Sequence, residues 1–169
     1  MRVDFALTSE DYPVRPVRVY LTHAHFYDPE DTPPSFSERT GFHVSLELER
    51  PGPLNLVVAL TVSTERDAPA QLTCTYAAEY EMNPAFNEEL RDEMLTLVAY
   101  NLGPRLLYTY VREFITNVTA RWRGEPLILP LSPLPITQGH DEIPPAPEDG
   151  SYQLPLIDEG EIVQEIYGN

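Results

Sequence analysis

The residue types that most often carry out chemistry are few in this sequence and widely spaced. The single cysteine, Cys74, lies inside a run that predicts a strand, with no glycine-rich turn nearby, and a cysteine in such a place usually packs as a small apolar side chain. His23 and His25 are one residue apart, so a strand would place both imidazoles on one face, a spacing that a metal ion can use. No third ligand has a defined spacing to them, and we therefore expect a solvated strand face with no metal.

Other catalytic signatures are absent from the sequence. There is no nucleophile elbow, phosphate-binding loop or dinucleotide-binding glycine motif. All 11 basic residues are arginines, and without lysine no Schiff base can form. His43 and His140 have no partner visible in the sequence, and no pair of carboxylates stands out as a general acid and base. We expect a protein that is not an enzyme and that needs no cofactor.

Composition limits the classes of partner. The 169 residues include 27 acidic and 11 basic ones, which gives a net charge of −16. Such a chain is a poor match for nucleic acids or anionic membranes, because both require clustered cations. A 42% apolar fraction allows a real core, while 18 prolines argue against a helical bundle. One cysteine, no membrane-spanning apolar run and no secretory signal at the N-terminus predict a cytoplasmic protein.

Four stretches in the first half predict an antiparallel sheet. They are rich in β-branched and aromatic residues, and the second alternates apolar and polar side chains cleanly. Short connections between the last three predict a meander, whereas the proline-rich linker 28–40 is long enough to cross over the sheet. The expected strands cover residues 17–26, 42–49, 54–63 and 71–82.

The second half changes to a helical period. Asn87 can cap a helix whose first turn is acidic. Gly103 and Pro104 should interrupt it, and a second stretch should run from about residue 105 to 123, ending at Gly124. These elements predict an α+β fold with a four-stranded antiparallel sheet and a long, Gly-Pro-broken helix.

The C-terminal part differs in charge and in proline content. Residues 136–169 hold eight acidic residues and no arginine. We expect an α+β domain over 1–135 and an extended, acidic, proline-rich tail over 136–169. The apolar clusters at 154–157 and 161–167 predict either a short docking motif or a frayed C-terminus.

One long stretch carries a resemblance to a known family. Residues 101–129 contain a Pro-x-x-Leu-x-x-Tyr-x-Arg-like helix that runs into a glycine-containing turn and a Pro-x-Leu segment. Arg18-Val19-Tyr20 on the first strand, and Phe26-Tyr27-Asp28-Pro29 leading into a crossover that ends near Phe36, follow the same order. Together, over residues 17–131, they resemble the SecB family of bacterial protein-export chaperones.

This resemblance implies that the long helix packs on one side of the four-stranded antiparallel sheet, and it also implies a function and two surfaces. The family holds unfolded polypeptides without ATP and assembles as a tetramer, a dimer of dimers, with its long helices at the interface. The client-binding residues implied here are Phe26, Phe36, Phe42, Val44 and Leu46, although these side chains could equally be core. The oligomer-interface residues implied here are Leu107, Tyr110, Val111, Phe114, Val118 and Trp122.

The sequence departs from the family at positions that affect its partners and its groove. Acidic residues on the first and fourth strands help the family to dock the translocase motor SecA, but the matching positions here are His23, Tyr27 and Thr75. Docking of SecA in the usual way is therefore not expected. The family's second helix is replaced by a proline-rich segment, residues 131–136, so the groove is either open or filled by the extended tail. Candidate residues for filling it are Leu154, Leu156, Ile157, Ile162, Val163, Ile166 and Tyr167.

Three functional hypotheses follow. The first is a cytoplasmic holding chaperone for unfolded or precursor polypeptides. The second is a non-catalytic adaptor of the same fold that binds one dedicated partner, such as an antitoxin. The third is an enzyme that uses His23 and His25 with carboxylates, which stoichiometric zinc in the purified protein would support.

Overall fold

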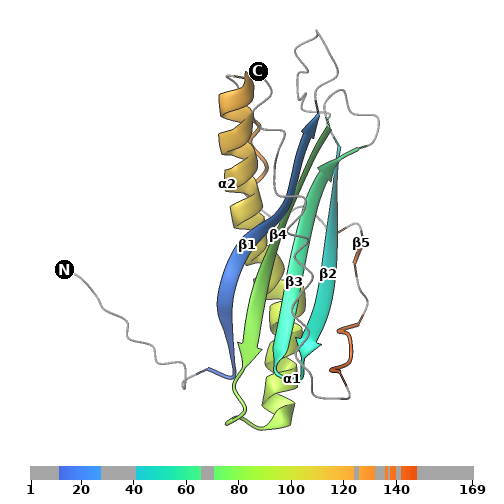
Figure 1. Cartoon of the computed structure of the whole chain (residues 1–169), viewed down its shortest axis with the longest axis vertical. Helices are drawn as coiled ribbons and strands as arrows, with labels where there is room; N and C mark the ends of the chain where they lie inside the picture. Colours follow the sequence, from blue (N-terminus) through green and yellow to red (C-terminus); the bar gives the residue numbers. More distant parts are fainter. Residues whose placement is uncertain are drawn as a thin grey trace, which may run out of the picture.

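The computed structural model describes residues 12–27, 41–65, 71–123, 126–131, 136, 138–139 and 142–147. Its centre is a twisted antiparallel sheet with a helical layer on one face (Figure 1). The four long strands are β1 (Val14–Tyr27), β2 (Phe42–Gly52), β3 (Asn55–Thr64) and β4 (Gln71–Met82). The predicted meander is confirmed for β2, β3 and β4. The order β1-β4-β3-β2 separates β1 from β2 by two strands, so the predicted crossover connection is confirmed too.

The core lies between the sheet and the helices. Strand alternation sends one set of side chains to the helical face, as shown by Val44, Leu46 and Leu48 of β2, which are all buried. Each strand of the meander contributes to this layer, and the paired residues Val44, Val62 and Cys74 form one row across it. The fold class predicted from the sequence is therefore confirmed.

The helical layer is one continuous helical stretch with a widened turn in the middle. It consists of α1 (Glu88–Leu97), the π-helical segment η1 (Val98–Leu102) and α2 (Gly103–Arg123). The predicted cap is confirmed, because the Asn87 side chain accepts a hydrogen bond from the Leu90 backbone N–H at 2.8 Å. Gly103 and Pro104 do not end the helix. A proline ring clashes with the carbonyl of the fourth residue before it, and the wider π turn, in which the Gly103 N–H bonds to Val98 O, lets the helix continue.

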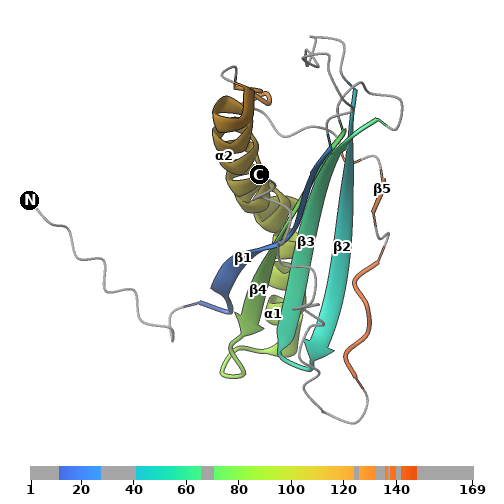
Figure 2. The same ribbon diagram turned by 45° about the horizontal axis from the view of Figure 1, so that its top comes forward.

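After α2 the chain turns back along the molecule. We call this part, described at residues 126–131, 136, 138–139 and 142–147, the return segment. It includes a fifth strand that the sequence did not predict, β5 (Gln138–Gly139), which pairs in parallel with Ser45 and Leu46 of β2. Figures 1 and 2 both show β5 and residues 142–147 beside the outer edge of β2. Within the described residues, no helix is long and apolar enough to span a bilayer.

Candidate functional site

Helix α2 divides the helical face of the sheet into two flanks. Its buried stripe, Leu107, Val111 and Ile115, is 0% exposed and is part of the core packed on the sheet. The side chains that flank this buried stripe lie along the two margins of the helix. On one margin are Tyr110 and Phe114, and on the other are Tyr108 and Arg112.

The first flank carries an aromatic cluster, which we define as Phe26, Tyr76, Tyr110 and Phe114. The Phe114 ring lies 6.2 Å from Phe26 of β1 and 6.1 Å from Tyr76 of β4, and the Tyr76 and Tyr110 rings are 5.8 Å apart. Tyr110 is 41% exposed, and the other three side chains are half-buried. Burial raises the pKa of Tyr76. The cluster offers a partner a rigid aromatic surface at low entropic cost.

The second flank holds the return segment by its backbone. Tyr108 Oη donates to Pro130 O at 3.1 Å, Arg112 Nε to Leu129 O at 2.9 Å, and Thr116 Oγ1 to Leu127 O at 3.1 Å. Thr119 Oγ1 accepts from the Leu127 N–H at 2.8 Å. We call these four α2 side chains the ladder. Their spacing of four, four and three residues places them on one helix face, where they can bind an extended chain whatever its side chains.

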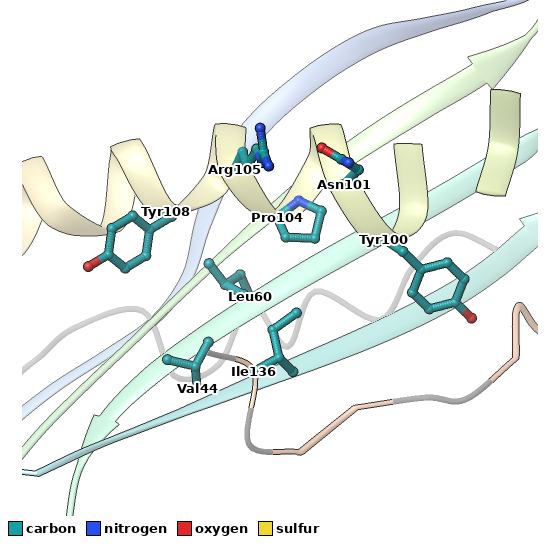
Figure 3. A pocket seen from close by; sticks show the side chains of 8 residues that line it. All are labelled: Val44, Leu60, Tyr100, Asn101, Pro104, Arg105, Tyr108 and Ile136. Carbon is teal, nitrogen blue, oxygen red and sulfur yellow. The ribbon is translucent and has the colours of Figure 1, made fainter. Parts of the chain in front are cut away.

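Between the ladder and the edge of β2 lies a pocket of about 240 Å³. Figure 3 shows Ile136 of the return segment beside Val44 and Leu60, opposite Pro104 of α2. Ile136 is 43% exposed, so it fills the pocket only in part. The eight residues that line this helix-edge pocket are Val44, Leu60, Tyr100, Asn101, Pro104, Arg105, Tyr108 and Ile136.

The client-binding residues expected from the sequence are scattered between core and surface. Val44 and Leu46 are 1% and 2% exposed and belong to the core, although Val44 also forms part of the pocket wall. Phe26 lies in the aromatic cluster, and Phe42 is half-buried at the start of β2. Phe36 lies outside the described residues. Among the described residues of this set, the structure therefore places Phe26 in the aromatic cluster and Val44 in the wall of the pocket.

The expected interface residues divide in the same way. Leu107 and Val111 face the sheet and are fully buried within the chain, because the sheet takes the most apolar stripe of α2. Tyr110, Phe114 and Val118 keep some exposure. Trp122 is the penultimate residue of α2, and its side chain lies outside the described part of the chain.

The opposite face of the sheet is polar. Arg18 Nε lies 2.6 Å from Glu79 Oε2, and Arg15 pairs with Glu81 in the next row. His23 and His25 are exposed on β1, and among the described residues no group of three or more His, Cys, Asp or Glu side chains is arranged to hold a metal. Cys74 is completely buried, and burial raises its pKa to about 12. Its thiol therefore belongs to the core.

Sequence reasoning missed the ladder, Tyr76 and Ile136. The ladder had a detectable signal, since Tyr108, Arg112 and Thr116 repeat at four residues beside the apolar stripe of α2. Tyr76 carried no such signal, because its aromatic partners come from β1 and α2. Ile136 was placed in the tail, and only the pairing of β5 with β2 reveals its role.

No family model matches the sequence, and no curated protein matches it. A solved structure that is similar is the Mycobacterium tuberculosis Rv1957 SecB-like chaperone in complex with a ChAD peptide from the Rv1956 HigA1 antitoxin. It aligns with a TM-score of 0.53 and 19% identity, over 71% of this chain and 88% of that one.

A protein of unknown function from Streptococcus agalactiae aligns at a TM-score of 0.39 and 14% identity, over 69% of this chain and 96% of that one. That likeness is too distant to support an argument. The four-stranded sheet with its crossover, the single helical layer and the alignment with the mycobacterial structure lead to one conclusion: this chain has the SecB-like chaperone fold, in a divergent form.

Proposed function

We propose that this protein is an ATP-independent holding chaperone that binds unfolded polypeptides through apolar and aromatic surfaces beside α2. The observation that carries the proposal is the SecB-like fold, together with the peptide complex of its mycobacterial neighbour. The aromatic cluster and the helix-edge pocket supply apolar contact area, and each Å² of apolar surface buried is worth about 25 cal/mol before ordering costs. A net charge of −16 favours solubility in a protein with such surfaces.

The exposed apolar side chains of the helical layer support this proposal. Helical residues with large apolar side chains that are at least one-third exposed are Leu90, Leu97, Tyr100, Leu102, Leu106 and Tyr110. Contiguous apolar patches on soluble proteins usually mark interaction sites. We propose that part of this surface joins subunits in a dimer or tetramer and that the remainder is available to clients.

The test is to dilute a chemically unfolded protein into buffer that contains increasing amounts of this chain, and to record light scattering. A holding chaperone suppresses aggregation near stoichiometric ratios, with no effect of added ATP. The variant Tyr110→Ser removes an exposed ring of the aromatic cluster and should weaken suppression several-fold. Undiminished aggregation at a tenfold excess of the wild-type chain would exclude general holding activity.

A second candidate is an adaptor that binds one dedicated partner, and one observation favours it. The mycobacterial neighbour is bound to a peptide from an antitoxin, which is a single defined partner. An adaptor would leave unrelated unfolded proteins to aggregate and would retain one partner with high affinity. The scattering experiment therefore separates the two candidates directly.

We propose that this activity takes place in the cytoplasm and serves protein export. SecA is not the favoured partner, because His23, Tyr27 and Thr75 occupy the strand positions where the family carries acidic residues. Pull-down of purified SecA with the purified chain tests this, and we expect no complex.

A further inference from the structure

The outer surface of α2 carries a basic stripe that the core does not use. Arg105, Thr109 and Arg112 follow one another at four and three residues, so they lie on one face of the helix. We call these three residues the arginine stripe. We propose that it binds an acidic segment of the same chain, residues 148–169, which lie outside the described part of the structure. The inference does not depend on the holding function, because the contact joins two parts of one chain.

Charge is distributed unevenly along the helical layer. The ten residues of α1 include four acids and one arginine, whereas the 21 residues of α2 include one acid, Glu113. Four of the 11 basic residues of the chain lie on α2: Arg105, Arg112, Arg121 and Arg123. In a chain with a net charge of −16, α2 is therefore the helical element to which an anionic segment is attracted.

The cations of the arginine stripe are free to pair with such a segment. Both arginines of β1 are already paired with glutamates of β4. Among the residues that the structure describes, neither Arg105 nor Arg112 has a carboxylate partner. Arg105 is exposed, and Arg112 uses its Nε to donate to Leu129 O, so its terminal nitrogens can still bind a carboxylate. A guanidinium and a carboxylate form a strong, charge-assisted hydrogen bond.

Exposed apolar side chains lie beside the arginine stripe. Leu102 precedes Arg105 by three residues and is 47% exposed, and Leu106 precedes Thr109 by three residues and is 36% exposed. Residues three apart on a helix are neighbours. A matching segment should therefore combine acidic with apolar side chains, so that its carboxylates reach the arginines while its apolar groups cover both leucines.

Residues 148–169 have this composition. Apolar side chains flank their acidic cluster, with Ile157 before it and Ile162 within it. They contain no basic residue, and their six acidic residues are Glu148, Asp149, Asp158, Glu159, Glu161 and Glu165. Bound to the stripe, the segment would cover Leu102 and Leu106 and so reduce the apolar surface that α2 offers to other molecules.

The spacing of the charges agrees with this contact. Asp158 and Glu161 are three residues apart, which is about 10 Å in an extended chain. The seven-residue step from Arg105 to Arg112 also rises about 10 Å along a helix. The chain from Pro147, the last described residue, to Asp158 can span about 36 Å, more than the roughly 32 Å length of α2. The segment is therefore long enough to reach the stripe.

The absence of lysine from this chain provides a direct test. In Arg105→Lys the new residue supplies the only side-chain amine of the protein. A carbodiimide joins such an amine to a carboxylate that it contacts, and mass spectrometry of the digested full-length chain identifies that carboxylate. We expect the amide to join position 105 to residues 158–165 in a product of single-chain mass, with a yield that falls several-fold in 1 M salt.

Two further variants calibrate this yield. Arg121→Lys makes the same change on an exposed residue of α2 that lies about 160° around the helix from Arg105. We expect it to give at least fivefold less coupling to residues 158–165. Arg15→Lys is the positive control, since Arg15 pairs with Glu81, and coupling to Glu81 shows that the reagent detects a direct ion pair.

A second measurement detects the bound segment without cross-linking. A dye attached to Ile157→Cys reports its own rotational freedom through fluorescence anisotropy, and Cys74, which is completely buried, should not react with the dye. We expect Arg105→Gln and 1 M salt each to lower the anisotropy to the same value. Arg121→Gln should leave it unchanged.

Three results would overturn the inference. One is coupling from position 105 that is no greater than coupling from position 121. Another is coupling only in products of twice the single-chain mass, which would assign the arginine stripe to a second copy of the chain. The third is an anisotropy that neither salt nor Arg105→Gln lowers. None of these measurements contains a client, so each result stands whether or not the protein holds unfolded chains.

Discussion

Thr119 is a buried hydroxyl that connects two segments of the chain. It is 0% exposed, donates to Ile115 O at 2.7 Å and accepts from the Leu127 N–H at 2.8 Å. Thr119→Val keeps the shape but leaves the Leu127 N–H unsatisfied, which costs about 1–3 kcal/mol in unfolding free energy. Thr109→Val, which loses only a hydroxyl bonded to Arg105 O on an exposed surface, is the matched control. Equal urea midpoints for the two variants would show that the return segment is not held by Thr119.

Cys74 should be chemically inert in the folded protein. With a pKa of about 12, roughly 10⁻⁴ of the thiol is ionised at pH 8, and the thiolate is the reactive form. We expect iodoacetamide to modify Cys74 only through unfolding, so that labelling accelerates at least a hundredfold in urea. Rapid labelling of the native chain would contradict the buried position.

The same thiol makes stability depend on pH in the alkaline range. Its pKa is about 12 in the folded chain against an ordinary value of 9.0, so the folded state keeps a proton that the unfolded state loses. The stabilisation is complete below about pH 9 and is lost as the pH rises toward 12. Urea midpoints measured from pH 7 to pH 10.5 should fall, and Cys74→Ala should flatten that slope. Burial also raises the pKa of four tyrosines, which contribute in the same direction: Tyr20, Tyr76, Tyr80 and Tyr108.

At the scale of the elements, the junction between η1 and α2 depends on a glycine. A methyl group added at Gly103 would lie 2.7 Å from Val98 O and 3.3 Å from Val58 Cγ1. Gly103→Ala, which in an exposed helix would be stabilising, should therefore lower the unfolding free energy by about 1–3 kcal/mol. Asn117→Ala on the exposed face of α2 is the control, and the measurement is thermal unfolding by circular dichroism. A gain in melting temperature for Gly103→Ala would mean that α2 can shift away from the sheet.

The elements that sequence reasoning placed well are those with strong local patterns. Alternation in 42–49 and the polar side chain of Asn87 predict β2 and the start of α1, because these signals act within a few residues. The continuity of the helix through Pro104 was not predictable, since it depends on a π turn packed against Val58 and Tyr80. The route of the return segment rests on hydrogen bonds between residues 8 to 22 positions apart, and the sequence does not show which backbone groups these side chains bind. The assignment of Leu107 and Val111 to an interface overlooked that the sheet buries the same stripe.

At the scale of the whole molecule, we expect the partly exposed face of α2 to join one subunit to another. We expect light scattering combined with size exclusion to give a molar mass that is a multiple of 19.2 kDa. Tyr110→Asp places a charge on the exposed margin of α2 and should shift the protein toward the single-chain mass. Ile128→Asp, on the return segment, should leave the mass unchanged. A single-chain mass for the wild type would exclude an obligate oligomer.

Strand β1 forms the other edge of the described sheet, and the shifts in its pairing affect the aggregation of newly made chains. A long, flat strand edge is a template for aggregation while chains are still folding. Here the pairing of β1 with β4 shifts between Pro16 and Arg18 and again between Leu21 and His23, and Thr22 donates to Thr75 O beside the second shift. Only short regular stretches remain for a stray strand to join. Newly made copies are thereby directed away from pairing with one another and toward the folded state.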